Sequence, residues 1–221
     1  MGKYLKLENP AYEFIFENGV LAINIPLTQS RVYSNTRTAH PHFLGMYQQL
    51  LDLLFGRCVK IENPFLAKTK GEVVKLLDAN GFRDLVKTTI SCPNITPLRW
   101  KGVKIGKKRH CGICFPCVVR RLSIHYANLW GNDTRYAKNI AADYSKIPKE
   151  AKELLFEMME FSREMDKCST VDDVFNVFPQ FFVEDVDPAL LFDMAKRHVA
   201  QFKDFLVKRA HQTLRQNLGL P

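Results

Sequence analysis

The residues best suited to chemistry are three cysteines at steps of three, in the segment RHCGICFPCVVRR: Cys111, Cys114 and Cys117. Thiolates at this spacing bind zinc, and a closed tetrahedral site needs a fourth ligand. We expect Cys92 to supply it, because this residue lies where a predicted strand ends. The pattern therefore predicts a four-cysteine zinc site of the structural type, which leaves no coordination position for water or a substrate.

Other ligand sets and other roles of the cysteines remain open. His110 and His125 compete with Cys92 for the fourth position, and an iron–sulfur cluster uses the same number of thiolates. A thioredoxin-type redox centre would instead show a lone C-x2-C pair. We expect Cys58 and Cys168 to be structural residues. Disulfides are not expected, because a chain of this size can build a core without them and the cytosol is reducing.

The positive charge of the chain is concentrated around the cysteines. The 221 residues include 32 Lys and Arg against 23 Asp and Glu, which gives a formal net charge of +9. Residues 85–132 hold nine of the basic residues and no acidic residue, so basic and acidic residues are equal in number over the rest of the chain. Such a segment favours an anionic partner, such as a nucleotide, a nucleic acid or an acidic protein. The alternative is a solvated basic loop that offsets the charge of metal-bound thiolates.

The cysteine cluster follows a succession of predicted strands and helices. Alternating apolar residues around Asn18-Gly19 predict a β-hairpin over residues 12–27. The order of strand, helix and strand that follows predicts part of an α/β sheet rather than an isolated zinc finger. These further elements are a helix at 41–55 ended by Gly56, a strand at 58–65, a helix opened by a Thr69–Glu72 capping box, a strand at 85–91, and a helix from about Cys114 to residue 130.

The last third of the sequence is predicted to be all-helical. Helices are expected from Pro148, after Thr170 as an N-cap, and from Asp187-Pro188 onward. Their Phe and Met residues are assigned to core packing and to no chemistry. We therefore expect two domains: an α/β domain with the zinc site at residues 1–143, and a helical C-terminal extension at residues 144–221.

Three segments resemble one known family. Ser91-Cys92 with HCGICFPCVVRR at residues 110–121 resembles the zinc site of the 7-cyano-7-deazaguanine synthases, which are PP-loop ATP pyrophosphatases of the adenine-nucleotide alpha-hydrolase type. NPFLAKTKGEVVKL at residues 63–76 is similar to a segment of that family that opens a helix near the nucleotide. SNTRTAHPHF at residues 34–43 is similar to an arginine-bearing loop of the family. The resemblance covers roughly residues 14–130 and implies the C-terminal part of a parallel PP-loop sheet.

The resemblance also implies a set of site residues and cofactors. It carries over two groups, namely the zinc ligands Cys92, Cys111, Cys114 and Cys117, and the nucleotide or substrate contacts Arg37, Lys70 and Arg120; Lys68, close to Lys70, is a further candidate contact. Independently, the two lysines lie at a helix start, where free amides and the helix dipole attract phosphate, and a guanidinium can grip an oxyanion. Ordinary solvated side chains are the alternative. In the family, ATP with magnesium activates a carboxylate to give a nitrile or an amide.

Two features depart from the family pattern. The pyrophosphatase loop Ser-Gly-Gly-x-Asp-Ser is absent, since the sequence contains no Gly-Gly pair. Eighteen residues separate Cys92 from Cys111, a longer interval than in the synthases. We therefore expect the second half of such an enzyme, which requires a protein partner or a preceding half with the Gly-rich loop. The segments are most similar to the synthase-like component of Qat-type anti-phage systems.

The sequence as a whole predicts the zinc-bearing half of a 7-cyano-7-deazaguanine synthase-like enzyme, inactive alone, in a cytoplasmic and antiviral setting. A nucleotide or deazapurine is the expected substrate. Two alternatives remain: a zinc-stabilised nucleic-acid-binding module that uses the basic segment, and a non-catalytic assembly subunit. No apolar run reaches the length of a membrane span, so no membrane partner is expected.

Overall fold

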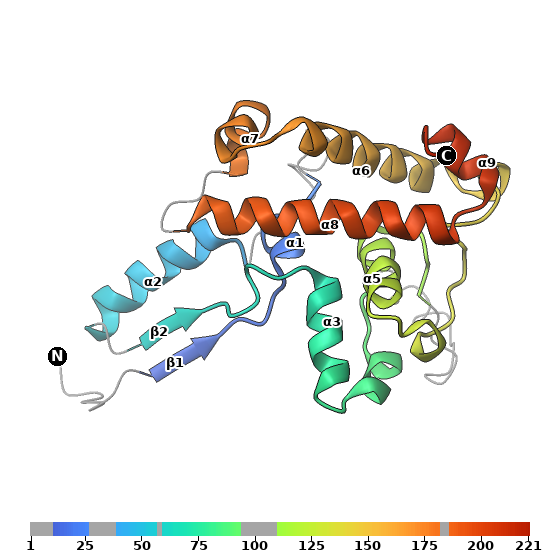
Figure 1. The fold of residues 1–221 in the computed structure, drawn as a ribbon. Helices are drawn as coiled ribbons and strands as arrows, with labels where there is room; N and C mark the ends of the chain where they lie inside the picture. The colour runs from blue at the N-terminus through green and yellow to red at the C-terminus, as the bar shows by residue number, and fades with distance from the viewer. Residues whose placement is uncertain (1–10, 27–38, 57–58, 94–109, 182–185) are drawn as a thin grey trace. The chain divides into compact units, whose positions relative to one another are not determined.

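The computed structural model of the chain (Figure 1) describes residues 11–26, 39–56, 59–93, 110–181 and 186–221. The chain divides into two units, and each is described by itself. The first unit comprises Met1–Thr69 and Lys167–Lys196, and the second comprises Lys70–Asp166 and Arg197–Pro221. The described residues are mostly helical and contain one small parallel sheet.

The sheet lies in the first unit. Strand β1 (Ala11–Phe14) pairs in parallel with strand β2 (Val59–Glu62). Helix α2 (Pro41–Phe55) packs beside β2, and the side-chain amide of Gln48 bonds one carbonyl and one amide of that strand, each at 2.8 Å. Parallel strands require a crossover connection, which α2 and its flanking segments provide. The parallel sheet agrees with the predicted α/β class, in a chain that is otherwise mostly helical.

The predicted hairpin over residues 12–27 is wrong beyond its first strand. Asn18 does not form a turn, but caps the short helix α1 (Gly19–Ala22) by accepting a bond from an amide of its first turn. Gly19 serves close approach of two backbones, since a Cβ at this position would lie 2.0 Å from the carbonyl oxygen of Leu66. The apolar alternation therefore reflects burial around a helix and not strand pairing.

Two other predictions for the first unit are confirmed. Helix α2 begins and ends as predicted, with Gly56 in the left-handed conformation as its C-cap. Its N-cap is His40, whose ring accepts a bond from the His42 amide, which is a structural role. The predicted strand at 58–65 is present as β2, although Cys58 itself lies outside the described residues.

Two helices of the second unit frame the cysteines. Helix α3 (Lys70–Ala79) packs on helix α5 (Phe115–Tyr126), and both occur where the sequence predicts them. Helix α5 begins immediately after Cys114, which is its N-cap residue, and Pro116 occupies its first turn, where the missing amide hydrogen costs nothing.

The predicted strand at 85–91 is wrong, because the 3-10 helix η2 (Arg83–Thr88) occupies its place. Val86 is the one residue of η2 whose side chain is buried, and it packs in a core cluster that includes Ile124 of α5. The hydroxyl of Thr89 bonds the carbonyl of Val86 at 2.8 Å, and Thr88 makes the equivalent bond to Leu85. Such local bonds compete with a β-ladder and explain why a threonine-rich run does not form a strand here.

From Tyr144 onward, every element in the described residues is helical, as predicted. Thr170 is the N-cap of one of them, as predicted, and the structure shows that it forms a capping box with Asp173. The elements are η5 (Tyr144–Lys146), α6 (Lys149–Lys167), α7 (Val171–Val177), η6 (Pro179–Phe181), α8 (Pro188–Arg209) and α9 (Gln212–Asn217). Phe202 and Phe205 of α8 are fully buried, which confirms a packing role for them.

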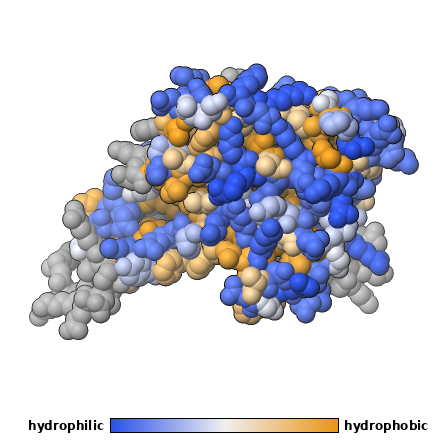
Figure 2. Space-filling model, in the orientation of Figure 1, coloured by the Kyte–Doolittle hydropathy of each residue, from blue (hydrophilic) through white to orange (hydrophobic). Residues whose placement is uncertain are grey.

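Apolar side chains remain exposed on the first unit. Tyr12 and Phe14 of β1 are about half exposed, and Leu53 of α2 is 85% exposed. Figure 2 shows apolar and polar side chains mixed across the visible face.

Within the described ranges, no helix combines the length and the apolar character needed to cross a membrane.

Candidate metal centre

Four sulfur atoms meet in the second unit. The Sγ atoms of Cys92, Cys111, Cys114 and Cys117 all lie within 4.8 Å of one another. Cys111 and Cys117 are 3.8 Å apart, and Cys92 and Cys114 are 3.9 Å apart. The structure thus brings together the four cysteines that the sequence analysis singles out, although Cys92 is 19 positions from the next of them. That they are ligands remains a prediction.

The backbone around Gly112 shapes the cluster. Gly112 adopts a φ of +85°, which side chains disfavour, and lies so close to Lys138 that a Cβ would fall 2.1 Å from its carbonyl oxygen. Next to this approach, the Lys138 amide donates to the Cys111 carbonyl at 3.0 Å, and the Ala137 amide donates to the His110 carbonyl at 2.8 Å. Residues 136–138 therefore lie alongside the turn that carries two of the sulfurs.

The sulfur geometry fits a single tetrahedral metal ion. Zinc–sulfur bonds of about 2.3 Å in a tetrahedron place neighbouring sulfurs about 3.8 Å apart. The two sulfur–sulfur distances of 3.8 and 3.9 Å agree with that value and are far too long for a disulfide. The mutual separations, all within 4.8 Å, leave room for one ion rather than a cluster of several irons. Tetrahedral thiolate sites favour zinc, so these residues fit the predicted metal.

The electrostatics of the cluster also favour a cation. Burial opposes ionisation of Cys111, but bonds from the amides of Ile113 and Cys114 outweigh it and lower the Cys111 pKa to about 7. The contact with the Cys117 side chain and burial raise the pKa of the Cys114 thiol. Sulfurs this close cannot all ionise by themselves, because like charges repel. A divalent ion supplies the missing positive charge and deprotonates its ligands.

The two histidines that compete as ligands lie outside the cluster. The Nε2 atom of His110 accepts a bond from the Ser91 amide at 3.1 Å, and its Nδ1 atom lies 2.7 Å from the Thr134 hydroxyl. Burial, followed by the charge of Arg120, lowers the pKa of His110, so the ring is neutral and ties the segment before Cys92 to the segment at Thr134. His110 thus supports the cluster from beside it.

His125 has partners at both ring nitrogens as well. Its Nε2 atom lies 2.9 Å from an Asp204 carboxylate oxygen, and its Nδ1 atom accepts a bond from Arg209 at 3.1 Å. Both partners belong to α8, which is far along the chain from all four cysteines. Of the described residues that could complete the sulfur cluster, Cys92 is the one that the geometry favours.

Arg120, the first arginine after the clustered cysteines, is buried and holds neighbouring segments together. Its side chain is 4% exposed and its Nε atom donates to Asp133 at 2.9 Å. Its other nitrogens donate to the Thr89 hydroxyl at 2.7 Å and to the Val86 carbonyl at 2.6 Å. These bonds fasten η2, and with it the chain leading to Cys92, onto α5. A contact between Arg120 and a substrate remains a prediction.

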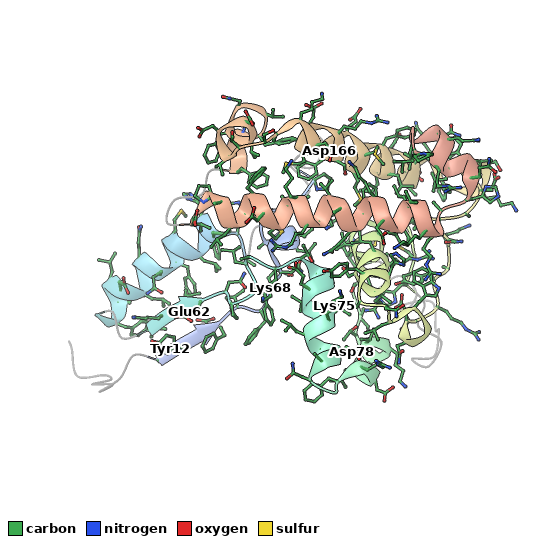
Figure 3. The ribbon with its side chains drawn as sticks, in the orientation of Figure 1. Tyr12, Glu62, Lys68, Lys75, Asp78 and Asp166 are labelled. Carbon is green, nitrogen blue, oxygen red and sulfur yellow. The ribbon has the colours of Figure 1, made fainter. Side chains whose placement is uncertain are left out.

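The predicted anion contacts are placed only in part. Lys70 begins α3 in the same unit as the cysteines, and its charge contributes to the lowered pKa of His110. Lys68 belongs to the first unit, where its carbonyl accepts a bond from the Gly19 amide at 2.9 Å (Figure 3). Arg37 and six of the nine basic residues of the segment 85–132, those within 94–109, lie outside the described residues, so their predicted roles remain predictions.

Sequence reasoning missed the segment that follows α5. The 3-10 helix η4 (Trp130–Asn132) leads into Asp133, whose oxygens accept bonds from Arg120, from the Thr134 amide at 2.7 Å and from the Tyr136 hydroxyl at 2.6 Å. A signal was present in the sequence: Asp133 is the first acidic residue after the stretch 85–132. A carboxylate at the end of so basic a segment is the natural partner of a buried arginine.

The sequence matches one characterised protein family. The profile of the family described as queuosine biosynthesis protein QueC matches residues 17–128, slightly more than half of the chain. This range contains α3, α5 and all four cysteines, but neither the segment at 130–139 nor the helices from α6 onward. No curated protein and no solved structure matches the chain.

Proposed function

Because the chain belongs to the QueC family, we propose that it is the zinc-bearing part of an ATP-dependent enzyme of the 7-cyano-7-deazaguanine synthase type. The proposal rests on one observation above the others: four cysteine sulfurs meet, at distances suited to zinc, inside the range that the family profile matches. The proposed substrates are a nucleotide and a deazapurine carboxylate. ATP activates the carboxylate, and a nitrogen nucleophile then gives the nitrile or the amide.

The proposed role of zinc is structural. A shell of four sulfurs is closed, so the ion supplies cross-linking and no site for water. It would join Cys92, which follows η2, to the turn at Cys111 and to the first turn of α5 at Cys117. The basic segment between Cys92 and Cys111 would thereby have both ends fixed at one point, which limits where its cations can lie.

The proposed anion contacts are Lys68, Lys70, Arg37 and Arg120. Support comes from the position of Lys70 on the first turn of α3, where the helix dipole favours phosphate. Because α3 packs on α5, this helix start and the cysteine cluster are held by one packed pair of helices. Magnesium would accompany ATP in the assembled enzyme. The division into an α/β domain at 1–143 and a helical extension at 144–221 belongs to the same proposal.

A partner segment with the Gly-rich pyrophosphatase loop is also part of the proposal. The sheet of the first unit supports it, because parallel strands normally lie in larger sheets with both faces covered. Here all four residues of β1 are exposed, and the rings of Tyr12 and Phe14 stack at 5.9 Å on one face. Further strands from a partner, or from a longer form of the chain, would extend the sheet, and the helices that connect them would cover these side chains. An anti-phage setting of the Qat type is the proposed context.

Reconstitution tests this function. The zinc-loaded chain is incubated with magnesium, ATP, 7-carboxy-7-deazaguanine and an ammonium salt as the nitrogen source, alone and with a polypeptide that carries the Gly-rich loop, and AMP, pyrophosphate and the 7-cyano product are measured. We expect turnover only in the combined reaction, and loss of it when Cys117→Ala replaces the wild type. Turnover by the isolated chain would contradict the need for a partner.

Two outcomes would favour the alternatives. Tight binding to DNA or RNA that weakens steeply with salt would favour a nucleic-acid-binding module. Stable assembly with the loop-bearing polypeptide, without any turnover on nucleotide or deazapurine substrates, would favour a non-catalytic assembly subunit.

A further inference from the structure

A second feature of the same unit is a buried arginine with an incomplete set of partners. Arg121 of α5 is 7% exposed. Its Nη1 atom donates to the side-chain oxygen of Asn139 at 2.8 Å, whereas its Nε atom has no hydrogen-bond partner among the described residues. A buried guanidinium is costly unless its charge is paired and its hydrogens are bonded. The neutral amide of Asn139 satisfies one hydrogen and no charge.

Aromatic rings compensate for part of this cost. The guanidinium carbon of Arg121 lies 4.8 Å from the ring centre of Tyr136 and 5.3 Å from that of Trp130. Cation–π contacts of this kind stabilise the charge through the ring faces, but they leave the hydrogens at the edge of the guanidinium unbonded. Burial still lowers the pKa of Arg121, so its surroundings oppose the charge that a guanidinium nevertheless keeps.

The nearest carboxylate is already engaged. One oxygen of Asp133 accepts bonds from Arg120 and from the Thr134 amide, and the other accepts the Tyr136 hydroxyl. Asp133 therefore neutralises Arg120 and has little acceptor capacity left for Arg121. The described residues therefore supply no carboxylate that pairs with Arg121 alone.

The space for such an oxyanion is present. An open pocket of about 400 Å³ lies against Arg121, Trp130 and Tyr136. Two further cations line it, Arg135 and Lys138, and neither forms an ion pair with any described residue. The lining thus contains three positive charges against the single carboxylate of Asp133.

We propose that this pocket binds a small molecule through a carboxylate or a phosphate group that pairs with Arg121, while Arg135 and Lys138 add charge at its rim. The oxyanion pairs with the guanidinium of Arg121 from the side that lines the pocket, and the rings of Tyr136 and Trp130 bound the space beside it. The residues that follow α5 in this pocket lie outside the range matched by the family profile, so the inference does not rest on the proposed function.

A simpler role for Arg121 makes a different prediction. Arg121 lies one helical turn after Cys117, whose thiolate charge acts favourably on it. Were Arg121 only the counter-charge of the metal centre, its loss would lower zinc affinity and the pocket would bind no added anion. Anion binding and zinc content therefore have to be measured on the same variants.

Isothermal titration of the zinc-loaded full chain with inorganic phosphate and, separately, with benzoate tests the proposal. We expect saturable binding of at least one probe, with the stronger one identifying the oxyanion. Because the variant loses the charge-assisted bond to the oxyanion, Arg121→Gln should weaken binding by at least about tenfold. The Arg135→Ala/Lys138→Ala variant, which changes exposed residues only, should weaken it less.

The control variant is Lys149→Ala, which removes an exposed charge at the start of α6 and should leave binding unchanged. Absence of binding by both probes overturns the proposal, as does equal binding by wild type and both pocket variants. Loss of zinc from Arg121→Gln with unchanged phosphate affinity would assign Arg121 to the metal centre alone. If Arg121→Gln does not fold, as judged by circular dichroism, the Arg135→Ala/Lys138→Ala variant tests the proposal: weaker binding supports it, and unchanged binding overturns it.

Discussion

Gly112 lies so close to Lys138 that a Cβ on the glycine would fall 2.1 Å from the lysine carbonyl oxygen. We predict that Gly112→Ala lowers the free energy of unfolding by more than about 3 kcal/mol, because a left-handed conformation costs a side chain about 1–2 kcal/mol and the clash adds to it. The turn at Cys111 must then shift, so zinc affinity should fall too. Urea unfolding and competition with a zinc chelator measure the two effects.

Gly81 provides the matched control for that variant. It has a similar φ of +82°, but a Cβ there meets nothing within 4 Å. Gly81→Ala should therefore cost only the conformational term of about 1–2 kcal/mol and leave zinc affinity unchanged. Equal effects of the two substitutions would show that the approach to Lys138 does not shape the cluster.

The cysteines of the cluster should differ sharply from the other described cysteine. Cys117 and Cys168 are both buried, but Cys168 lies in the first unit and is not among the four clustered sulfurs. Cys117→Ala should weaken zinc binding by more than about a hundredfold, because it opens the coordination shell. Cys168→Ala should retain stoichiometric zinc. Zinc lost from both variants, or from neither, would contradict this assignment.

The ion pair between Arg120 and Asp133 should contribute strongly to stability. Both side chains are buried, at 4% and 8% exposure. Arg120→Leu leaves Asp133 buried without its charge partner, and we expect a loss of about 3–5 kcal/mol in the free energy of unfolding. Arg83 and Asp78 form the exposed counterpart at 2.7 Å, so Arg83→Leu should lower the free energy of unfolding far less than Arg120→Leu does. Similar losses at both sites in urea unfolding would argue against this account.

His198 should make stability depend on pH. This residue of α8 is 2% exposed, and neither ring nitrogen has a hydrogen-bond partner among the described residues. Burial lowers its pKa from 6.5 to about 4, so between these values the unfolded chain binds the proton that the folded chain excludes. Relative to a protonated ring, neutral His198 therefore favours the folded state above pH 6.5. As the pH falls towards 4 this effect is lost, and the free energy of unfolding drops by about 3 kcal/mol.

His198→Leu removes that titration. The difference in free energy of unfolding between the variant and the wild type, measured by urea unfolding from pH 4 to 7 at constant zinc, should change in favour of the variant as the pH falls. A difference that stays constant across this range would show that His198 is not buried in neutral form.

The four-cysteine cluster could be predicted from sequence because its spacing has few uses. C-x2-C-x2-C in a chain with few cysteines indicates thiolate coordination, and Cys92, the next cysteine upstream, was the natural fourth member, although the strand expected before it is the 3-10 helix η2. The same information did not predict the bonds that Arg120 makes within the fold. Its bonds reach across 31 residues to Thr89 and 34 to Val86, and such contacts depend on how η2 packs against α5.

The helices were easier to predict than the strands. Helix ends carry local signals, such as Gly56 after α2 and Thr170 before α7, and these signals were correct. The two wrong strands lie where a local side-chain bond overrides an apolar or β-branched pattern: Asn18 caps α1, and Thr89 bonds back to Val86. β-propensity depends on packing partners, so it is a weak guide where the described sheet has only two strands.

The metal itself provides the most direct test of the account. Purified chain should contain one zinc ion per molecule by elemental analysis, and X-ray absorption at the zinc edge should show four sulfur ligands at about 2.3 Å. Absence of stoichiometric metal, or nitrogen or oxygen atoms in the first coordination shell, would contradict the four-cysteine site and the function proposed from it.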